Sequence, residues 1–148
     1  MSHLLKHMGD SAQYHHFDYW VTVRPSEDVP GQWVAHCLNI DVVSQGNSLA
    51  HAFEMIMEAS LQTVMDDVAA GRDPDERRAP QEFWTDLWKT MPKTRTFSQI
   101  PKGAKIACAI AQLYLAVPRE LAKGKKKQPE PIHEVPAFFT VENHASHA

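Results

Sequence analysis

The sequence contains little cysteine, no long hydrophobic run and no strong excess of charge of either sign. Its two cysteines, Cys37 and Cys108, are fewer than a small secreted domain stapled by disulfides usually carries. No segment approaches the roughly 20 consecutive apolar residues of a membrane span. The N-terminal residues also lack the apolar stretch of a secretory signal. We therefore expect a protein of the reducing cytoplasm with no membrane segment.

The balance of charge excludes another group of functions. With 18 acidic and 15 basic side chains the net charge is -3, so no global field draws the chain onto nucleic acid or anionic lipid. The sequence also lacks a Gly-rich phosphate loop, a Ser nucleophile elbow and a Cys-His pair at motif spacing. We expect a protein that is not an enzyme and that holds no cofactor or metal.

What is present is enough for one modest domain with a core of its own. The chain has 148 residues and is 43% hydrophobic. Every second residue from Phe17 to Val23 is apolar, which predicts a strand with one buried face, and Pro25 ends it. After the turn sequence SEDVPG, residues 32–38 and 40–44 return to β-rich composition. Short connections predict that these three strands form an antiparallel meander.

A tight turn follows the meander and predicts where a long helix begins. Gly46 lies where the chain needs a residue tolerant of positive φ, and after Asn47 comes Ser48, a suitable N-cap. Gly71 supplies the end of the helix. Apolar and small residues recur between these points at three- and four-residue steps and form one stripe, which we expect to pack on the sheet: Leu49, Ala52, Phe53, Ile56, Met57, Ser60, Val64 and Val68.

The second half of the chain predicts a linker, a short helix and a last strand. Residues 71–80 are charged and interrupted by proline, as linkers are. Residues 81–91 predict a short helix with Pro80 at its first position. Residues 105–117 would also suit a helix, but they fit a final strand of the same sheet better. The apolar side of the short helix comprises Phe83, Trp84, Leu87, Trp88 and Met91.

The expected organisation is a single ordered domain between two unstructured ends. Residues 1–16 are predicted to be disordered, residues 17–117 to form the domain, and residues 118–148 to be a Lys/Pro-rich tail. Within the tail, Phe138 to Val141 could pair as a strand, dock into a partner or pack loosely on the domain. The run from Lys123 to Lys127 could contact phosphate, although a solvated tail is the simpler interpretation, because no aromatic residues interleave with the lysines.

The passage from the second strand into the helix carries a family resemblance. Residues 34–36 read Val-Ala-His, matching a strand written as Val-Ala followed by a polar residue. Residues 44–49 read Ser-Gln-Gly-Asn-Ser-Leu, close to the turn Ser-Gln-Gly-Asp-Thr-Leu, and residues 37–41 contain the variant Cys-Leu-x-x-Asp. With these motifs, residues 17–68 resemble the HicB antitoxin family.

This resemblance implies an α+β domain with a partial ribonuclease H-like fold that lacks nuclease activity. It also implies a role in binding and neutralising a small toxin ribonuclease of the HicA type. We expect such a domain to be a homodimer. Residues 118–148 contain no capped helical pair of the kind that forms a DNA-binding module in repressor members, so DNA binding is not expected. The inserted tryptophan-bearing helix would mark a subgroup with a different partner.

Three residues are candidates for contact with a protein partner. Trp84 and Trp88 lie on the short helix, and their simpler interpretation is that this helix covers the second face or an edge of the sheet. His36 is expected at the surface or in an interface. Its neighbour Cys37 points to the opposite face of the strand, so the two cannot share a metal ligand or a proton. Cys37 and Cys108 are both interpreted as buried small hydrophobic residues.

Two other classes of function remain as alternatives. A metal-dependent nuclease would need carboxylates that converge on two metal ions, and Asp18, Asp41 and Glu54 are the candidates. Asp18 lies on the polar side of its strand and Glu54 points away from the apolar stripe, so solvated surface carboxylates are favoured. The other alternative is a solitary relative of the fold that serves as a structural or assembly subunit with another protein partner.

Overall fold

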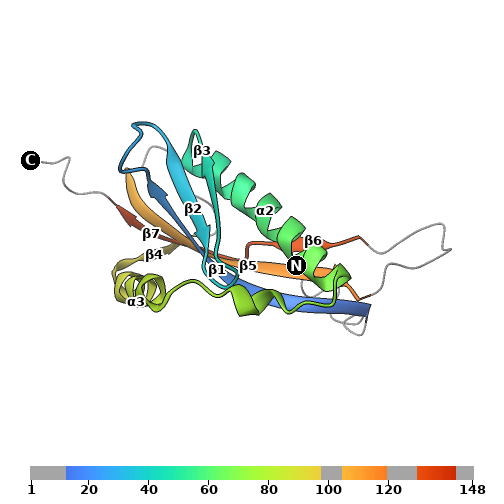
Figure 1. The fold of residues 1–148 in the computed structure, drawn as a ribbon. Coiled ribbons are helices and arrows are strands. Elements are labelled where there is room, and N and C mark those ends of the chain that lie inside the picture. The colour runs from blue at the N-terminus through green and yellow to red at the C-terminus, as the bar shows by residue number, and fades with distance from the viewer. Residues whose placement is uncertain (1–12, 98–104, 120–129, 143–148) are drawn as a thin grey trace, which may run out of the picture.

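The computed structural model describes residues 13–97, 105–119 and 130–142. Within them seven strands form one antiparallel sheet, and two α-helices lie against it (Figure 1), so the α+β class is confirmed. The strands are β1 (Tyr14–Pro25), β2 (Trp33–Cys37), β3 (Val42–Gly46), β4 (Arg95–Phe97), β5 (Ile106–Pro118), β6 (Ile132–Glu134) and β7 (Phe138–Glu142), and the helices are α2 (Leu49–Ala69) and α3 (Gln81–Thr90).

The predicted meander of β1, β2 and β3 is confirmed, with shifted limits. Val21 lies opposite Cys37, and Ala35 lies opposite Ser44. The first strand begins at Tyr14, three residues before the expected start of order. The reason is that every residue from Tyr14 to Val23 pairs with a residue of β5. The third strand begins two residues later than expected, since the residues before Val42 form the turn.

The strand expected over residues 105–117 is confirmed as β5, but it is not the last strand of the chain and it lies in the middle of the sheet. The order of strands in the sheet is β3-β2-β1-β5-β7-β4. Strand β6 is not part of this order and pairs with β5. Strand β5 is buried on both faces, which explains why its sequence is apolar without alternation. The expectation that it is the final strand is wrong, because β6 and β7 follow it in the chain, and β7 pairs with it on the side away from β1.

Part of the expected C-terminal tail is therefore ordered as strand. Residues 138–142 pair with both β5 and β4, which decides the open question of Phe138 to Val141 in favour of strand pairing. Phe138 packs on the α2 side of the sheet, whereas Phe139 and Val141 pack on the other side. The predictions for residues 1–12, for the run Lys123 to Lys127 and for residues 143–148 lie outside the described residues.

Helix α2 covers one face of the sheet and matches the prediction closely. Its buried residues are Leu49, Ala52, Phe53, Ile56, Ser60, Val64 and Asp67. They face alternate residues of the strands, including Tyr19, Val21 and Val23, in the larger core cluster. The helix ends at Ala69, and Gly71 follows at φ +72°, a conformation that glycine adopts without strain.

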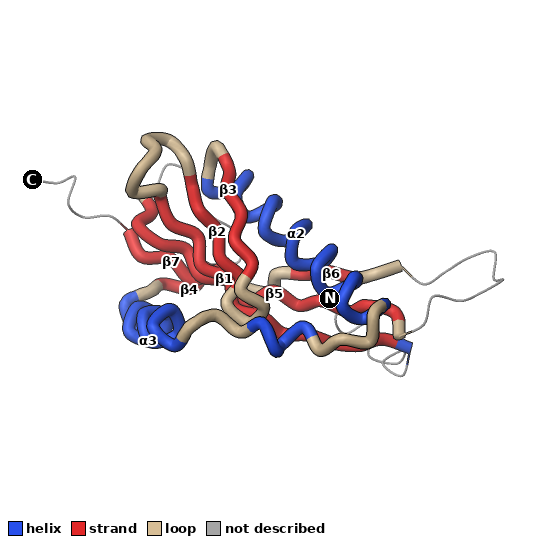
Figure 2. Tube along the Cα trace, viewed as in Figure 1, coloured by secondary structure: helices blue, strands red, loops and turns tan. Residues whose placement is uncertain are grey.

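Helix α3 lies on the opposite face of the sheet (Figure 2). This matches the simpler interpretation of the short helix. Pro80 occupies the N-cap rather than the first helical position. Among the described residues, neither helix is long and apolar enough to cross a membrane. The second core cluster, between α3 and the sheet, comprises Leu38, Ala79, Trp84, Leu87, Cys108 and Ile110.

Candidate functional site

The corner between β3 and α2 is fixed by close contact rather than by an unusual backbone angle. A Cβ placed on Gly46 would lie 2.2 Å from the backbone nitrogen of Ala52, so no larger residue fits. The expectation of positive φ at Gly46 is wrong, since the described glycines with positive φ are Gly31 and Gly71. The predicted cap is confirmed, because Ser48 Oγ accepts a hydrogen bond from the His51 N–H at 3.0 Å. The Asn47 N–H in turn donates to His51 Nδ1 at 2.9 Å.

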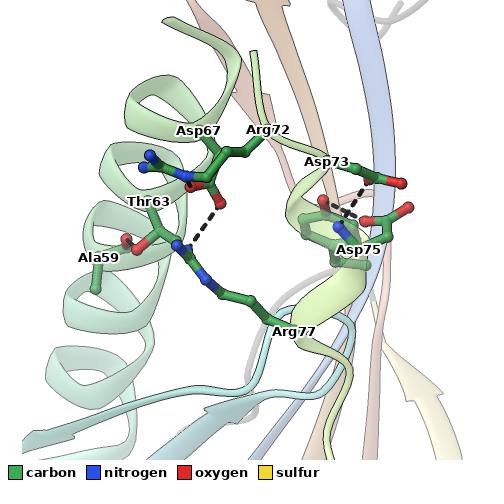
Figure 3. A network of polar contacts seen from close by, with 8 residues as sticks. Ala59, Thr63, Asp67, Arg72, Asp73, Asp75 and Arg77 are labelled. Carbon is green, nitrogen blue, oxygen red and sulfur yellow. Dashed lines mark hydrogen bonds and ion pairs between the residues drawn. The ribbon is translucent and has the colours of Figure 1, made fainter. Parts of the chain in front are cut away.

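The segment between the helices is anchored to α2 and to β1, although its composition predicted only a linker. Asp67, at the end of α2, is buried and accepts hydrogen bonds from Arg72 Nε at 3.0 Å and from Arg77 Nη1 at 2.8 Å (Figure 3). A buried carboxylate needs such partners, because an unpaired buried charge is strongly unfavourable. Both arginines lie after Gly71, so they hold the linker against the helix that it leaves.

A second set of contacts fixes the linker to β1, inside the sheet, and to the residue that follows β2. The Tyr19 hydroxyl donates to Asp75 Oδ1 at 2.7 Å, and burial together with this carboxylate raises the pKa of Tyr19. Asp73 caps the 3-10 helix Pro74–Arg77 by accepting from the Asp75 N–H. The Ala79 N–H donates to the Leu38 carbonyl at 2.8 Å. The linker therefore determines where α3 begins.

The exposed surface of α3 is aromatic on both sides of its buried stripe. Trp88 is 50% exposed and meets Trp20 of β1 edge-on, with ring centroids 5.4 Å apart. Phe83 is 41% exposed. Trp84 is buried, and the guanidinium of Arg78 lies 3.8 Å from the centre of its ring. Of the two candidate partner-binding tryptophans, Trp88 is accessible, whereas Trp84 is buried in the core, as the simpler interpretation of this helix expected.

His36, expected at the surface or in an interface, is not exposed at the surface but packed within the domain. It is 8% exposed, and its Nε2 lies 2.7 Å from Asp41 Oδ1. Phe83 meets the imidazole edge-on at 4.9 Å between ring centroids. Asp41 has φ +50°, a left-handed conformation that Asp tolerates better than most residues. The pair therefore joins the turn between β2 and β3 to α3.

Strand β3 forms one edge of the sheet. Among the described strands it pairs with β2 alone. Its residue Val43 lies opposite His36, so the two side chains share the face of the sheet that carries α3. Val43 is 55% exposed. The aromatic surface of α3 thus continues through Phe83 and His36 to the edge of the sheet, a continuity that no single motif in the sequence indicated.

The three candidate nuclease carboxylates lie in different parts of the molecule. Asp18 lies opposite Tyr114, on the face away from α2. Asp41 is engaged with His36 in the turn, and Glu54 is exposed on α2. Across residues 13–97, 105–119 and 130–142, no group of three His, Cys, Asp or Glu side chains is placed to hold a metal ion.

Both cysteines are free and buried, as the sequence predicted, but they lie on opposite faces of the sheet. Cys37 belongs to the α2 cluster and Cys108 to the α3 cluster. Burial raises the pKa of Cys37 to about 12 and also raises the pKa of Cys108. Neither thiol is therefore poised as a nucleophile, since the thiolate is the reactive form.

The structure is a sheet domain in which aromatic side chains of α3 and the outer strand β3 are both exposed. No protein-family model, curated protein or solved structure matches the chain.

Proposed function

We propose that the chain is a HicB-like protein-interaction domain that binds and neutralises a small toxin ribonuclease of the HicA type. The family part of this proposal is supported by the motifs of residues 34–49 and by the order of elements that they fold into, a three-stranded meander followed by a capped helix. The interaction part is carried by one observation, the exposure of Trp88 and Phe83 on α3.

Exposed aromatic residues on a fixed helix are suited to binding a folded partner. Large aromatic side chains dominate the affinity of many interfaces, since they bury much area and lose little conformational entropy. Helix α3 is held by two buried side chains below, Trp84 and Leu87, and by the anchored linker before it. The partner would therefore meet a preformed surface, which lowers the entropic cost of association.

The surroundings of Trp88 match the polar rim of an interface. Arg24 of β1 and Asp86 of α3 form an exposed ion pair, and Lys89 is exposed beside Trp88. Both signs of charge are present, so the rim would set orientation more than affinity. The two free, buried cysteines support a place in the reducing cytoplasm for this function.

The proposal is tested with the small basic protein of double-stranded-RNA-binding type that a neighbouring reading frame would encode. Co-expression of the chain should restore the growth of cells that express this protein, and the purified pair should form a complex. Trp88→Ala should weaken the complex by ten-fold or more. Met55→Ala is the matched control, because Met55 is 37% exposed on α2, on the opposite side of the sheet.

Equal binding by wild type, Trp88→Ala and Met55→Ala would remove α3 from the interface. Absence of such a neighbouring gene would favour the assembly subunit instead. RNA cleavage that needs magnesium or manganese and is lost in Asp18→Asn would contradict the proposal in favour of the nuclease.

A further inference from the structure

We propose that β3 is a self-pairing edge, through which two copies of the chain join antiparallel into one continuous sheet with Ser44 on the twofold axis. This inference goes beyond the proposed function and does not depend on it, because it concerns the edge of the sheet and not the aromatic surface of α3. It commits to a second copy of this chain as the occupant of the edge.

The direction of the backbone groups follows from the hydrogen bonds of β2. The Leu38 N–H donates to the Trp20 carbonyl of β1. Along a strand of an antiparallel sheet, the backbone N–H and C=O groups of successive residues point alternately to the strand on one side and to the strand on the other. The backbone groups of His36 and Val34 therefore also point to β1, and those of Ala35 point to β3. Ala35 lies opposite Ser44, which therefore points its backbone groups inward. Val43 and Gln45 consequently point their N–H and C=O groups outward, away from the sheet.

These outward groups match a second copy of the same strand. With Ser44 on the twofold axis, Val43 lies opposite Gln45 of the second copy, and each such pair exchanges two hydrogen bonds. All four outward N–H and C=O groups of β3 are then satisfied in both copies. The strand reads Val-Val-Ser-Gln-Gly and carries no charge, so two copies approach without repulsion between them.

The edge also lacks the features that usually prevent sheets from associating. Exposed edges are commonly protected by lysine, proline, inward charge or a β-bulge. Residues 42–46 contain neither lysine nor proline, and their register with β2 is regular. Val43 is more exposed than any other large hydrophobic residue identified in the described chain. An uncharged, regular strand with an exposed valine is a template for further pairing.

Side chains on the α3 face would extend the contact beyond the backbone. A twofold axis perpendicular to the sheet keeps each helix of the second copy on the same face as its counterpart. Val43 then meets the side chain of Gln45 of the second copy, and Phe83, which packs on His36 beside Val43, lies near the join. The second copy would therefore cover apolar surface as well as backbone groups.

The first test is the mass of the full chain in solution, measured by sedimentation over a wide range of concentration. Wild type should associate to two chains. Val43→Pro should shift the chain to a monomer, because proline removes an outward N–H but no hydrogen bond to β2. Val43→Thr is the matched control and should stay a dimer, since it keeps the N–H and the β-branched shape. Circular dichroism should show that both variants are folded.

The second test measures the register and does not depend on proline being tolerated. Opposite residues on the axis of such a pair have Cα atoms about 4.5 Å apart, within disulfide range. Ser44→Cys should therefore form a covalent dimer under oxidation, while Gln45→Cys, displaced from the axis, should form much less. The two native cysteines are buried and should not interfere.

A wild type that stays monomeric at all concentrations would overturn the inference. So would a dimer that survives in Val43→Pro and does not cross-link through Ser44→Cys. A monomer in which Val43→Pro lowers toxin binding would assign the edge to the toxin instead. Loss of toxin binding in Trp88→Ala concerns the proposed function alone, so the failure of one proposal can be told from the failure of the other.

Discussion

The two faces of the sheet are covered by helices of very different kinds. Helix α2 has 21 residues and buries seven of them, whereas α3 has 10 residues and buries two. The α2 face is sealed by a continuous cluster that runs through Val21, Ile56 and Leu113. The α3 face is narrower and leaves Phe83 and Trp88 in contact with solvent. One face of the sheet is therefore closed by a large buried core, whereas the other leaves aromatic side chains exposed.

The largest expected effect distinguishes the cores of the two faces. Ile56 and Leu87 are both fully buried, one under each helix. Ile56→Ala should lower the free energy of unfolding by about 4 kcal/mol, and Leu87→Ala by about 2 kcal/mol, because the short helix can settle into the cavity more easily. Denaturant unfolding measures both values. A larger loss for Leu87→Ala would reverse the assignment of stability to the α2 face.

The next effect concerns how closely α2 approaches the sheet. Gly46→Ala should cost about 3 kcal/mol, because the new methyl group would overlap the backbone of Ala52. Gly31→Ala is the control. It has no neighbour within 4 Å of a new Cβ, so it should cost only about 1 kcal/mol, from its positive φ. Thermal and denaturant unfolding of the two variants compare them directly, and equal losses would mean that the corner is not tight.

The alkylation rates of the two cysteines compare how readily the two faces of the sheet open. Cys108, under the short helix, should be alkylated faster than Cys37, because opening of α3 exposes it while α2 stays in place. Both rates should rise to that of an ordinary thiol in denaturant. Mass spectrometry after timed alkylation measures the order. Faster labelling of Cys37 would show that the α2 face opens first.

The raised pKa of Cys37 predicts a smaller effect, a loss of folding stability at high pH. The folded state holds the thiol proton more tightly than the unfolded state, whose thiol titrates near 9.0. Stability from this group is therefore constant below that pH and falls as the pH rises from there to about 12. Cys37→Ala should lose less stability over this range than the wild type. Equal pH dependence in the two proteins would contradict the assignment.

The smallest expected effect is on the free energy of unfolding when an exposed aromatic residue of α3 is removed. Trp88→Ala should lower the free energy of unfolding by about 1 kcal/mol, because half of the residue is already exposed and its ring forms a T-shaped pair with Trp20. Met55→Ala should change it by less. If Trp88→Ala unfolded the domain instead, the exposed tryptophan would be a structural residue and the contrast between the faces would be lost.

Local patterns in the sequence predicted the first half of the fold well. These elements are specified by residues that are close together in the sequence, so a short segment is enough to predict each of them. They are the alternation from Phe17 to Val23, the cap at Ser48 and the apolar stripe of α2. Strand β5 was predicted from its composition, but its central place was not. Pairing partners far apart in sequence decide that place, and β7 is one of them.

The sequence did not predict which site residues are exposed, because tertiary contacts decide their burial. The helical pattern placed Trp84 and Trp88 on one side of α3, but it could not show that Trp84 joins a buried cluster with residues far away in the sequence, such as Cys108. Histidine is a polar residue type that is often found at the surface. His36 is buried because Phe83 packs against its ring and Asp41 forms a hydrogen bond with its Nε2. The Asp67 cluster was missed for the same reason, since its two arginines come from a segment that reads only as a linker.

That cluster limits how the chain can vary in length. Arg72 and Arg77 both bind the Asp67 carboxylate (Figure 3), while Asp75 between them accepts a hydrogen bond from Tyr19. These contacts fix the number of residues that can lie between residue 67 and residue 79. An added or deleted residue there would slide α3 along the strands and carry Phe83 and Trp88 away from His36 and Trp20. Related chains that keep this aromatic surface should therefore tolerate insertions in the loop before Trp33 but keep the length of this one.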